Sequence, residues 1–245
     1  MKKLVLLLGI ILFMSCYTDS NDFDNSTSGE IQLLRNVFLG NELLYSFDYY
    51  PDGKLMSQTN FSGGAISHFA YFEYANDTVY KTISGIFSSK SKSYQGNSNT
   101  IVLMEFDNED NLLFYYLSNY SSPNCGLTTT DMYTRYGQLY TTTKYDYIDS
   151  NCSYNSKSEL SNGEQKNNYA ITKDNKNNYL RSVNTWPSFE KKHNIIEYKK
   201  WDADNNLVLN SSYNSVFVYD NNGYPIQESR TSLSGVTKVY NYEYY

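Results

Sequence analysis

Aromatic side chains recur at every second position over much of this chain. Residues 43–49 read LLYSFDY and residues 240–244 read YNYEY, so that Tyr or Phe alternates with polar residues. A β-strand points successive side chains to opposite faces, and this alternation predicts strands that bury one face. The 27 tyrosines and 12 phenylalanines supply such faces, and no window after residue 30 carries an apolar stripe at helical spacing. The chain is therefore predicted to be all-β.

Short clusters of Asp, Asn and Gly separate the predicted strands. Clear copies begin at Tyr50, Phe106, Trp201 and Tyr219, and a weaker copy begins at Tyr74. Asp early in a turn caps backbone N–H groups, and Gly or Asn late in the turn accepts a positive φ. Loops of this length join neighbouring antiparallel strands. We expect an antiparallel meander of tandem β-hairpins, roughly twelve to sixteen strands, that forms a twisted or curled sheet.

The hairpin segments resemble a known repeat. Residues 47–55 (FDYYPDGKL) and 218–223 (VYDNNG) are similar to YD repeats, the Tyr-Asp hairpins of RHS-type proteins, and to hairpin-repeat lipoproteins of Gram-negative envelopes. The first segment also resembles MORN-like variant repeats. Residues 133–158 keep the aromatic alternation but lack the turn signature. The resemblance implies an architecture and no activity, because YD repeats are structural units without catalytic residues.

The N-terminus carries an export signal. Residues 1–15 join two lysines to an apolar run that is shorter than the ~20 residues of a membrane span, as in a secretory signal. Cys16 follows Ser15, which looks like a bacterial lipoprotein signal in which Cys16 is lipidated, although Phe13 stands where Leu is usual. The alternative is an ordinary secretory signal. We expect a protein that its lipid anchors to the outer membrane of a Gram-negative bacterium.

The remainder divides into a tether and one domain. Residues 16–30 are polar, acidic and without periodicity, which predicts a flexible tether, and residues 31–245 form a single β-hairpin-repeat domain. The net charge of −6 argues against nucleic acid as a partner and against a polybasic membrane patch. The membrane is then contacted through the N-terminal lipid alone.

No catalytic constellation is present in the sequence. Cys125 and Cys152 would close a disulfide around roughly 27 residues in an oxidising envelope, the alternative being two free thiols. A zinc site needs three or four converging ligands, and the only histidines, His68 and His193, are isolated in separate predicted strands and do not suggest one. The Asp-rich turn at residues 202–206 lacks the Gly and Glu of a calcium loop. We therefore predict no enzyme activity, no cofactor and no metal.

Binding is the favoured function class. Rows of Tyr could pack a sheet face or meet a sugar ring or a protein partner, and Trp186 and Trp201 are candidate binding aromatics. The polar stretches 84–100 and 151–178 are expected to be long loops or irregular hairpins. The predicted function is a non-enzymatic envelope lipoprotein that binds a protein or glycan partner through its sheet face or loops. A purely structural envelope protein is the alternative, and a carbohydrate-active enzyme is the third hypothesis.

Overall fold

A computed structural model describes residues 32–245 except 87, 98, 121–126 and 182–192. This part of the chain contains sixteen strands and one short 3-10 helix. The elements are β1 (Leu34–Leu39), β2 (Glu42–Tyr49), β3 (Leu55–Ser62), β4 (Ala65–Ala75), β5 (Thr78–Gly85), β6 (Ser89–Asn97), β7 (Thr100–Phe106), β8 (Leu112–Tyr120), β9 (Leu127–Thr134), β10 (Leu139–Tyr147), β11 (Tyr154–Leu160), β12 (Gln165–Lys173), η1 (Tyr179–Arg181), β13 (Ile195–Trp201), β14 (Tyr213–Tyr219), β15 (Pro225–Ser232) and β16 (Thr237–Tyr244).

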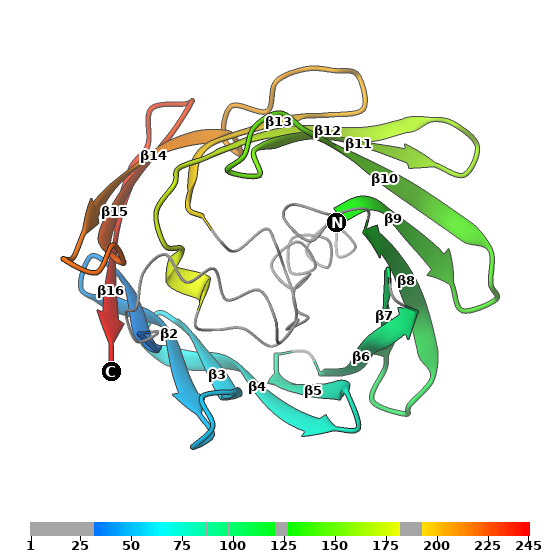
Figure 1. Ribbon diagram of the computed structural model, residues 1–245, viewed down its shortest axis with the longest axis horizontal. Coiled ribbons are helices and arrows are strands. Elements are labelled where there is room, and N and C mark those ends of the chain that lie inside the picture. The colour runs from blue at the N-terminus through cyan, green and yellow to red at the C-terminus, as the bar shows by residue number, and fades with distance from the viewer. Residues whose placement is uncertain (1–31, 87, 98, 121–126, 182–192) are drawn as a thin grey trace.

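The strands form a closed antiparallel barrel (Figure 1). Each strand pairs with the next in sequence, and β1 pairs with both β2 and β16. Val37 marks the seam, since it lies opposite Tyr45 on β2 and Tyr242 on β16. The predicted all-β meander is confirmed, but the expectation of an open, curled sheet is wrong. Closure gives both terminal strands a second partner, and so leaves neither as an unpaired edge.

The predicted turns are confirmed, and all of them except the two-residue turn after Tyr74 share one backbone geometry. At Asp202, the N–H donates to the Asn206 carbonyl over 3.0 Å, and the Asn205 N–H donates back to Asp202 over 3.1 Å. Asn205 has a φ of 62°, and the Asp202 carboxylate accepts from the Asn206 N–H over 2.8 Å. The same pair of backbone bonds begins at Tyr50, Asp107, Thr134, Leu160, Asp202, Asp220 and Ser232. This is the three-residue hairpin loop in which a left-handed residue completes a tight turn.

Two of the expected loops are largely strands. Residues 84–100 contain β6, and residues 151–178 contain β11 and β12. The polar composition of these segments predicted loops, but Ser156 and Ser158 of β11 are buried although both are polar. The Ser158 hydroxyl lies 2.8 Å from the hydroxyl of Thr143 on the neighbouring strand. A wall that satisfies its buried hydroxyls in pairs does not need an apolar sequence.

The main hydrophobic cluster lies on the inner wall. It joins residues of β1–β5 and β16, including Val37, Phe47, Phe72 and Tyr242. The 3-10 helix η1 lies inside the ring of strands (Figure 1), where the Tyr179 ring stacks on Tyr242 with centroids 4.5 Å apart. Because η1 packs on this cluster, the cluster identifies which face of the wall points inward. None of the described helical segments is long and apolar enough to cross a membrane.

Candidate functional site in the barrel interior

The pairing register of the strands shows which side chains point into the barrel. Paired residues on antiparallel strands point to the same side. Tyr240 shares the face of Tyr242 because it lies two residues away on β16, and it pairs with Glu228 on β15. Tyr213 on β14 pairs with Ser232 of β15 and with Tyr198 of β13. The tyrosines of β13, β14 and β16 therefore all face inward.

Five of these inward side chains, one from each of β12 to β16, form a continuous row that we call the inner ladder. Its members are Tyr169, Tyr198, Tyr213, Arg230 and Tyr240. The first three rings follow one another with centroids 5.9 Å and 5.2 Å apart. The Arg230 guanidinium lies 4.5 Å from the Tyr213 centroid and 4.8 Å from that of Tyr240. Stacking of this kind fixes the plane of a guanidinium and leaves its edge for hydrogen bonds.

Glu228 orients Arg230 from within the wall. Its side chain is 1% exposed, and its two carboxylate oxygens accept from Arg230 Nε over 2.7 Å and Nη2 over 3.1 Å. The same carboxylate accepts from the hydroxyls of Ser215 and Tyr242, each over 2.6 Å. Burial opposes the charge of Arg230, but nearby Tyr213 and Glu228 outweigh it and raise the pKa of Arg230. The guanidinium is therefore a fixed cation.

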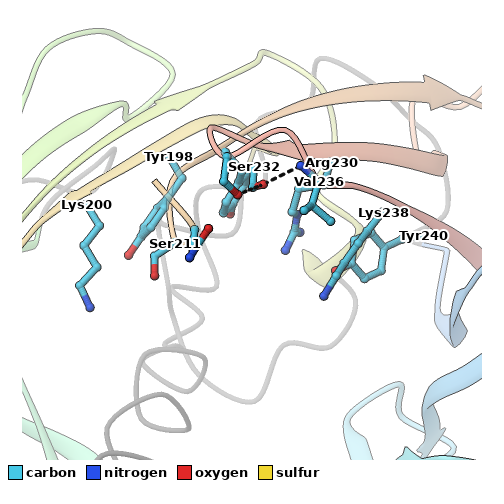
Figure 2. A pocket seen from close by; sticks show the side chains of 11 residues that line it. Tyr198, Lys200, Ser211, Arg230, Ser232, Val236, Lys238 and Tyr240 are labelled. Carbon is cyan, nitrogen blue, oxygen red and sulfur yellow. Dashed lines mark hydrogen bonds between the residues drawn. The ribbon is translucent and has the colours of Figure 1, made fainter. Parts of the chain in front are cut away.

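A pocket of about 580 Å³ opens beside the inner ladder. Residues of β13 to β16 and of their connections line it, and Figure 2 shows Tyr198, Lys200 and Tyr240 extending from the same side of the strands. Its lining includes three cations, Lys200, Arg230 and Lys238, and no carboxylate. Burial raises the pKa of Tyr198, so that this phenol stays neutral. The pocket can therefore offer neutral aromatic faces beside positive charge.

The pocket lies at the end of the barrel opposite to the start of β1 and the end of β16. The Tyr245 N–H donates to the Leu33 carbonyl over 3.0 Å, so β1 begins where β16 ends. Ser211, in the β13–β14 connection, and Ser234, in the β15–β16 turn, both line the pocket. Both connections follow odd-numbered strands of an antiparallel meander. They therefore lie at the far end from residue 33.

The outer face of β10, β11 and β13 carries charged residues, whereas β14 points Val216 and Val218 outward. Lys199 and Glu197 point outward from β13, because they alternate with the inward Tyr198, and they form an ion pair of 2.8 Å. Lys157 on β11 pairs with Glu159 over 2.7 Å and lies opposite Lys144 of β10. On these three strands the wall has aromatic side chains inside and charge outside.

The structure places Trp201 and Cys152 outside the lining of the pocket. Trp201 is half-buried at the end of β13, alternating with Lys200, and it bridges to Leu207. Cys152 is buried, has a φ of 60° and is disulfide-bonded. Cys16, Cys125 and Trp186 lie outside the described residues, so lipidation and the partner of Cys152 stay predictions.

The two histidines do not meet. His68 lies on β4, with its Nδ1 3.2 Å from the Ser67 hydroxyl. His193 lies in the β12–β13 connection, where its Nδ1 is 3.2 Å from the Lys176 carbonyl. Within the described ranges, no three metal-binding side chains come together.

A second polar cluster anchors the β12–β13 connection to the wall. Asn194 is fully buried, and its side-chain amide donates to the Asn177 carbonyl over 2.8 Å and to Asp174 over 3.2 Å. The Tyr219 hydroxyl donates to the same Asp174 carboxylate, and burial together with this contact raises the pKa of Tyr219. These contacts fix the connection to β14, and so place η1 inside the barrel.

Sequence reasoning missed the cations of the pocket. Glu228 and Arg230 are two residues apart in a strand, which puts both on one face. That spacing was a usable signal for an intrastrand ion pair. Lys199 and Lys200 gave none, because adjacent lysines point to opposite faces and the sequence does not say which face is enclosed.

Comparison with known proteins supports the fold alone. No family model and no curated protein matches the sequence. A porin-like protein from Bacteroides uniformis ATCC 8492 is similar in structure, with a TM-score of 0.55 and 12% identity over 89% of this chain and 94% of that one. A porin-like protein from Bacteroides vulgatus ATCC 8482 gives a TM-score of 0.53 and 10% identity over 87% and 99%. The resemblance to YD repeats remains a prediction.

Proposed function

We propose that this chain is a non-enzymatic envelope lipoprotein whose barrel stands in water and binds a glycan on its inner wall. The observation that carries the proposal is the sidedness of the wall at β10, β11 and β13, with aromatic side chains inside and charged residues outside. The predicted lipid on Cys16 would hold the protein to its membrane. The similarity to porin-like barrels supports an envelope location.

The outer face argues against contact with lipid. A membrane-spanning strand needs about 9–11 residues and an apolar outward band. Strands β11 and β13 have seven residues each and point Lys157 and Lys199 outward near their middles. An outward lysine at the bilayer midplane costs about 2–4 kcal/mol. Three such residues, counting Lys144, would outweigh much of the stability of a folded domain.

The inner face suits a sugar chain. Tyrosines offer rigid amphipathic surfaces that lose little conformational entropy on binding, and a pocket of about 580 Å³ is of the size that holds small ligands. Glycoside hydrolysis uses two convergent carboxyl groups, whereas the pocket lining offers none. The enclosed position favours an extended ligand over a folded protein partner. Binding without catalysis is the function that this geometry supports best.

Two measurements test the proposal. The first follows the full chain with Cys16→Ser, expressed with its signal peptide beside the wild type. We expect the variant in the detergent-free fraction and the wild type with the membranes. A variant that stays in the membrane, and conducts ions when reconstituted, would contradict a barrel that stands in water.

The second measurement is retention of a panel of polysaccharides on the immobilised Cys16→Ser protein. Saturable retention of one glycan class is the expected result. Tyr198→Leu, which removes one ring of the inner ladder, should weaken that retention, while Tyr80→Leu on the outer face of β5 should not. No retention across the panel would leave a purely structural envelope role.

A further inference from the structure

We propose that the pocket selects acidic glycans, sugar chains that carry an anionic group on successive residues. This inference rests on the proposed glycan-binding function and specifies its ligand class. The observation behind it is that three cations line the pocket, and that the wall supplies a carboxylate partner for one of them, Arg230.

The charge count around the pocket leaves two cations without a counterion. Glu228 pairs with Arg230. Neither Lys200 nor Lys238 forms an ion pair in the part of the chain that the structure describes. The Lys200 ammonium nitrogen lies 5.9 Å from the centroid of the Tyr169 ring. In a chain of net charge −6, a cluster of unneutralised cations on an enclosed wall favours an anionic ligand.

Arg230 is held in place by its neighbours and still has N–H donors available for such a ligand. It lies over the rings of Tyr213 and Tyr240, and two of its N–H groups donate to Glu228. A guanidinium has five N–H donors, so three remain after these bonds. The side chain keeps 30% of its surface exposed. A held, partly exposed guanidinium suits the planar geometry of a carboxylate.

The cations form a row across the strands. Arg230 and Lys238 are cross-strand partners on β15 and β16, and Lys200 lies two strands away on β13. Neighbouring strands are ~4.8 Å apart, so the row runs across several strand spacings. A chain with one charge per sugar can meet more than one of these cations while its rings contact Tyr198 and Tyr213. A single anion would use only part of the row.

The experiment compares oligogalacturonate with its methyl ester by calorimetry on the full chain. The two probes share the sugar ring and linkage, and differ in the charge of the carboxylate. We expect the ester to bind at least about tenfold more weakly, because a hydrogen bond to a charged group contributes about that factor or more. Binding of the acid should also weaken as salt is raised from 0.05 to 0.5 M. Dextran sulfate and dextran repeat the comparison for sulfate.

The double variant Lys200→Gln/Lys238→Gln tests the residues. It should weaken oligogalacturonate binding by about tenfold or more and leave the binding of the ester unchanged. Lys199→Gln is the matched control, since the neighbouring residue of the same strand faces outward, and it should bind like the wild type. Circular dichroism confirms that each variant is folded.

The outcomes separate the two proposals. If the ester binds as tightly as the acid, or if the double variant binds the acid like the wild type, selection for acidic glycans is overturned while glycan binding stands. If sulfated dextran alone is selected over its neutral partner, the anionic requirement holds and its source is sulfate. If no acidic or neutral glycan binds, both proposals fail.

Discussion

Glu228→Gln is the substitution for which the structure makes its sharpest stability prediction. The glutamate is 1% exposed and accepts four hydrogen bonds, two of them from Arg230 and one each from Ser215 and Tyr242. Glutamine has nearly the same shape but no charge, and its amide nitrogen can only donate. The variant therefore leaves Arg230 without its counterion and at least one former donor without an acceptor.

The cost follows from that pairing. Removal of one partner of a buried ion pair typically costs about 3–5 kcal/mol, because the other charge stays buried and uncompensated. Arg230 keeps 30% of its side-chain surface exposed, which places the expected loss at the lower end, about 3 kcal/mol. For a domain of roughly 200 residues this lowers the melting temperature by about 6–12 °C.

Urea unfolding followed by circular dichroism measures the loss. Glu228→Gln/Arg230→Met removes both charges, and we expect it to recover more than half of the lost free energy, since an apolar replacement of a buried pair is often close to neutral. Glu197→Gln removes an exposed partner of Lys199 and should change the free energy by less than about 1 kcal/mol. A loss below about 1 kcal/mol for Glu228→Gln, or a double variant no more stable than the single one, would refute the reasoning.

Two further substitutions probe the backbone and a buried acid. A Cβ at Gly85 would lie 2.3 Å from the Ser67 carbonyl oxygen at a φ of 138°, so Gly85→Ala should cost at least about 2 kcal/mol in urea unfolding, whereas Gly63→Ala, with open space around it, should cost about 1 kcal/mol. Burial raises the pKa of Glu105, against the opposing effect of its hydrogen bond from Tyr116. The raised pKa favours the protonated acid in the folded state, so stability falls as pH rises from the ordinary glutamate pKa to the raised one. Glu105→Gln should therefore be more stable than the wild type at pH 7 and equal to it near pH 4; equal stability at both pH values would contradict this assignment.

The strands and turns were predictable because their signals are local. Period-2 alternation and the Asp, Asn and Gly clusters each act within a few residues, and the turn at Asp202 has the cap and the left-handed residue that its sequence predicted. Closure of the barrel was not predictable in this way. It depends on the pairing of Val37 with Tyr242, two residues at opposite ends of the chain. Nothing in either strand alone distinguishes a closed sheet from a curled one.

The candidate site was predictable only in its chemistry. The tyrosine rows were identified as binding or packing surfaces, and the row at residues 240–244 contributes Tyr240 to the inner ladder. Which face is enclosed could not be read from alternation, because a strand with Tyr198 on one face and Lys199 on the other is compatible with either arrangement. The packing of Tyr179 on Tyr242 settles this point, and it comes from a connection whose polar sequence showed no such role.

The even number of strands also determines at which end of the barrel the pocket opens relative to the lipid anchor. Leu33 and Tyr245 meet at one end of the barrel, and the connections that line the pocket lie at the other. If the mature chain begins at a lipidated Cys16, residues 16–31 give at most about 50 Å of reach from the membrane. The anchored end would then be the end nearest the lipid, and the cations of the pocket would face away from it. The position best placed to meet a soluble glycan is thus the one where the wall leaves positive charge unpaired.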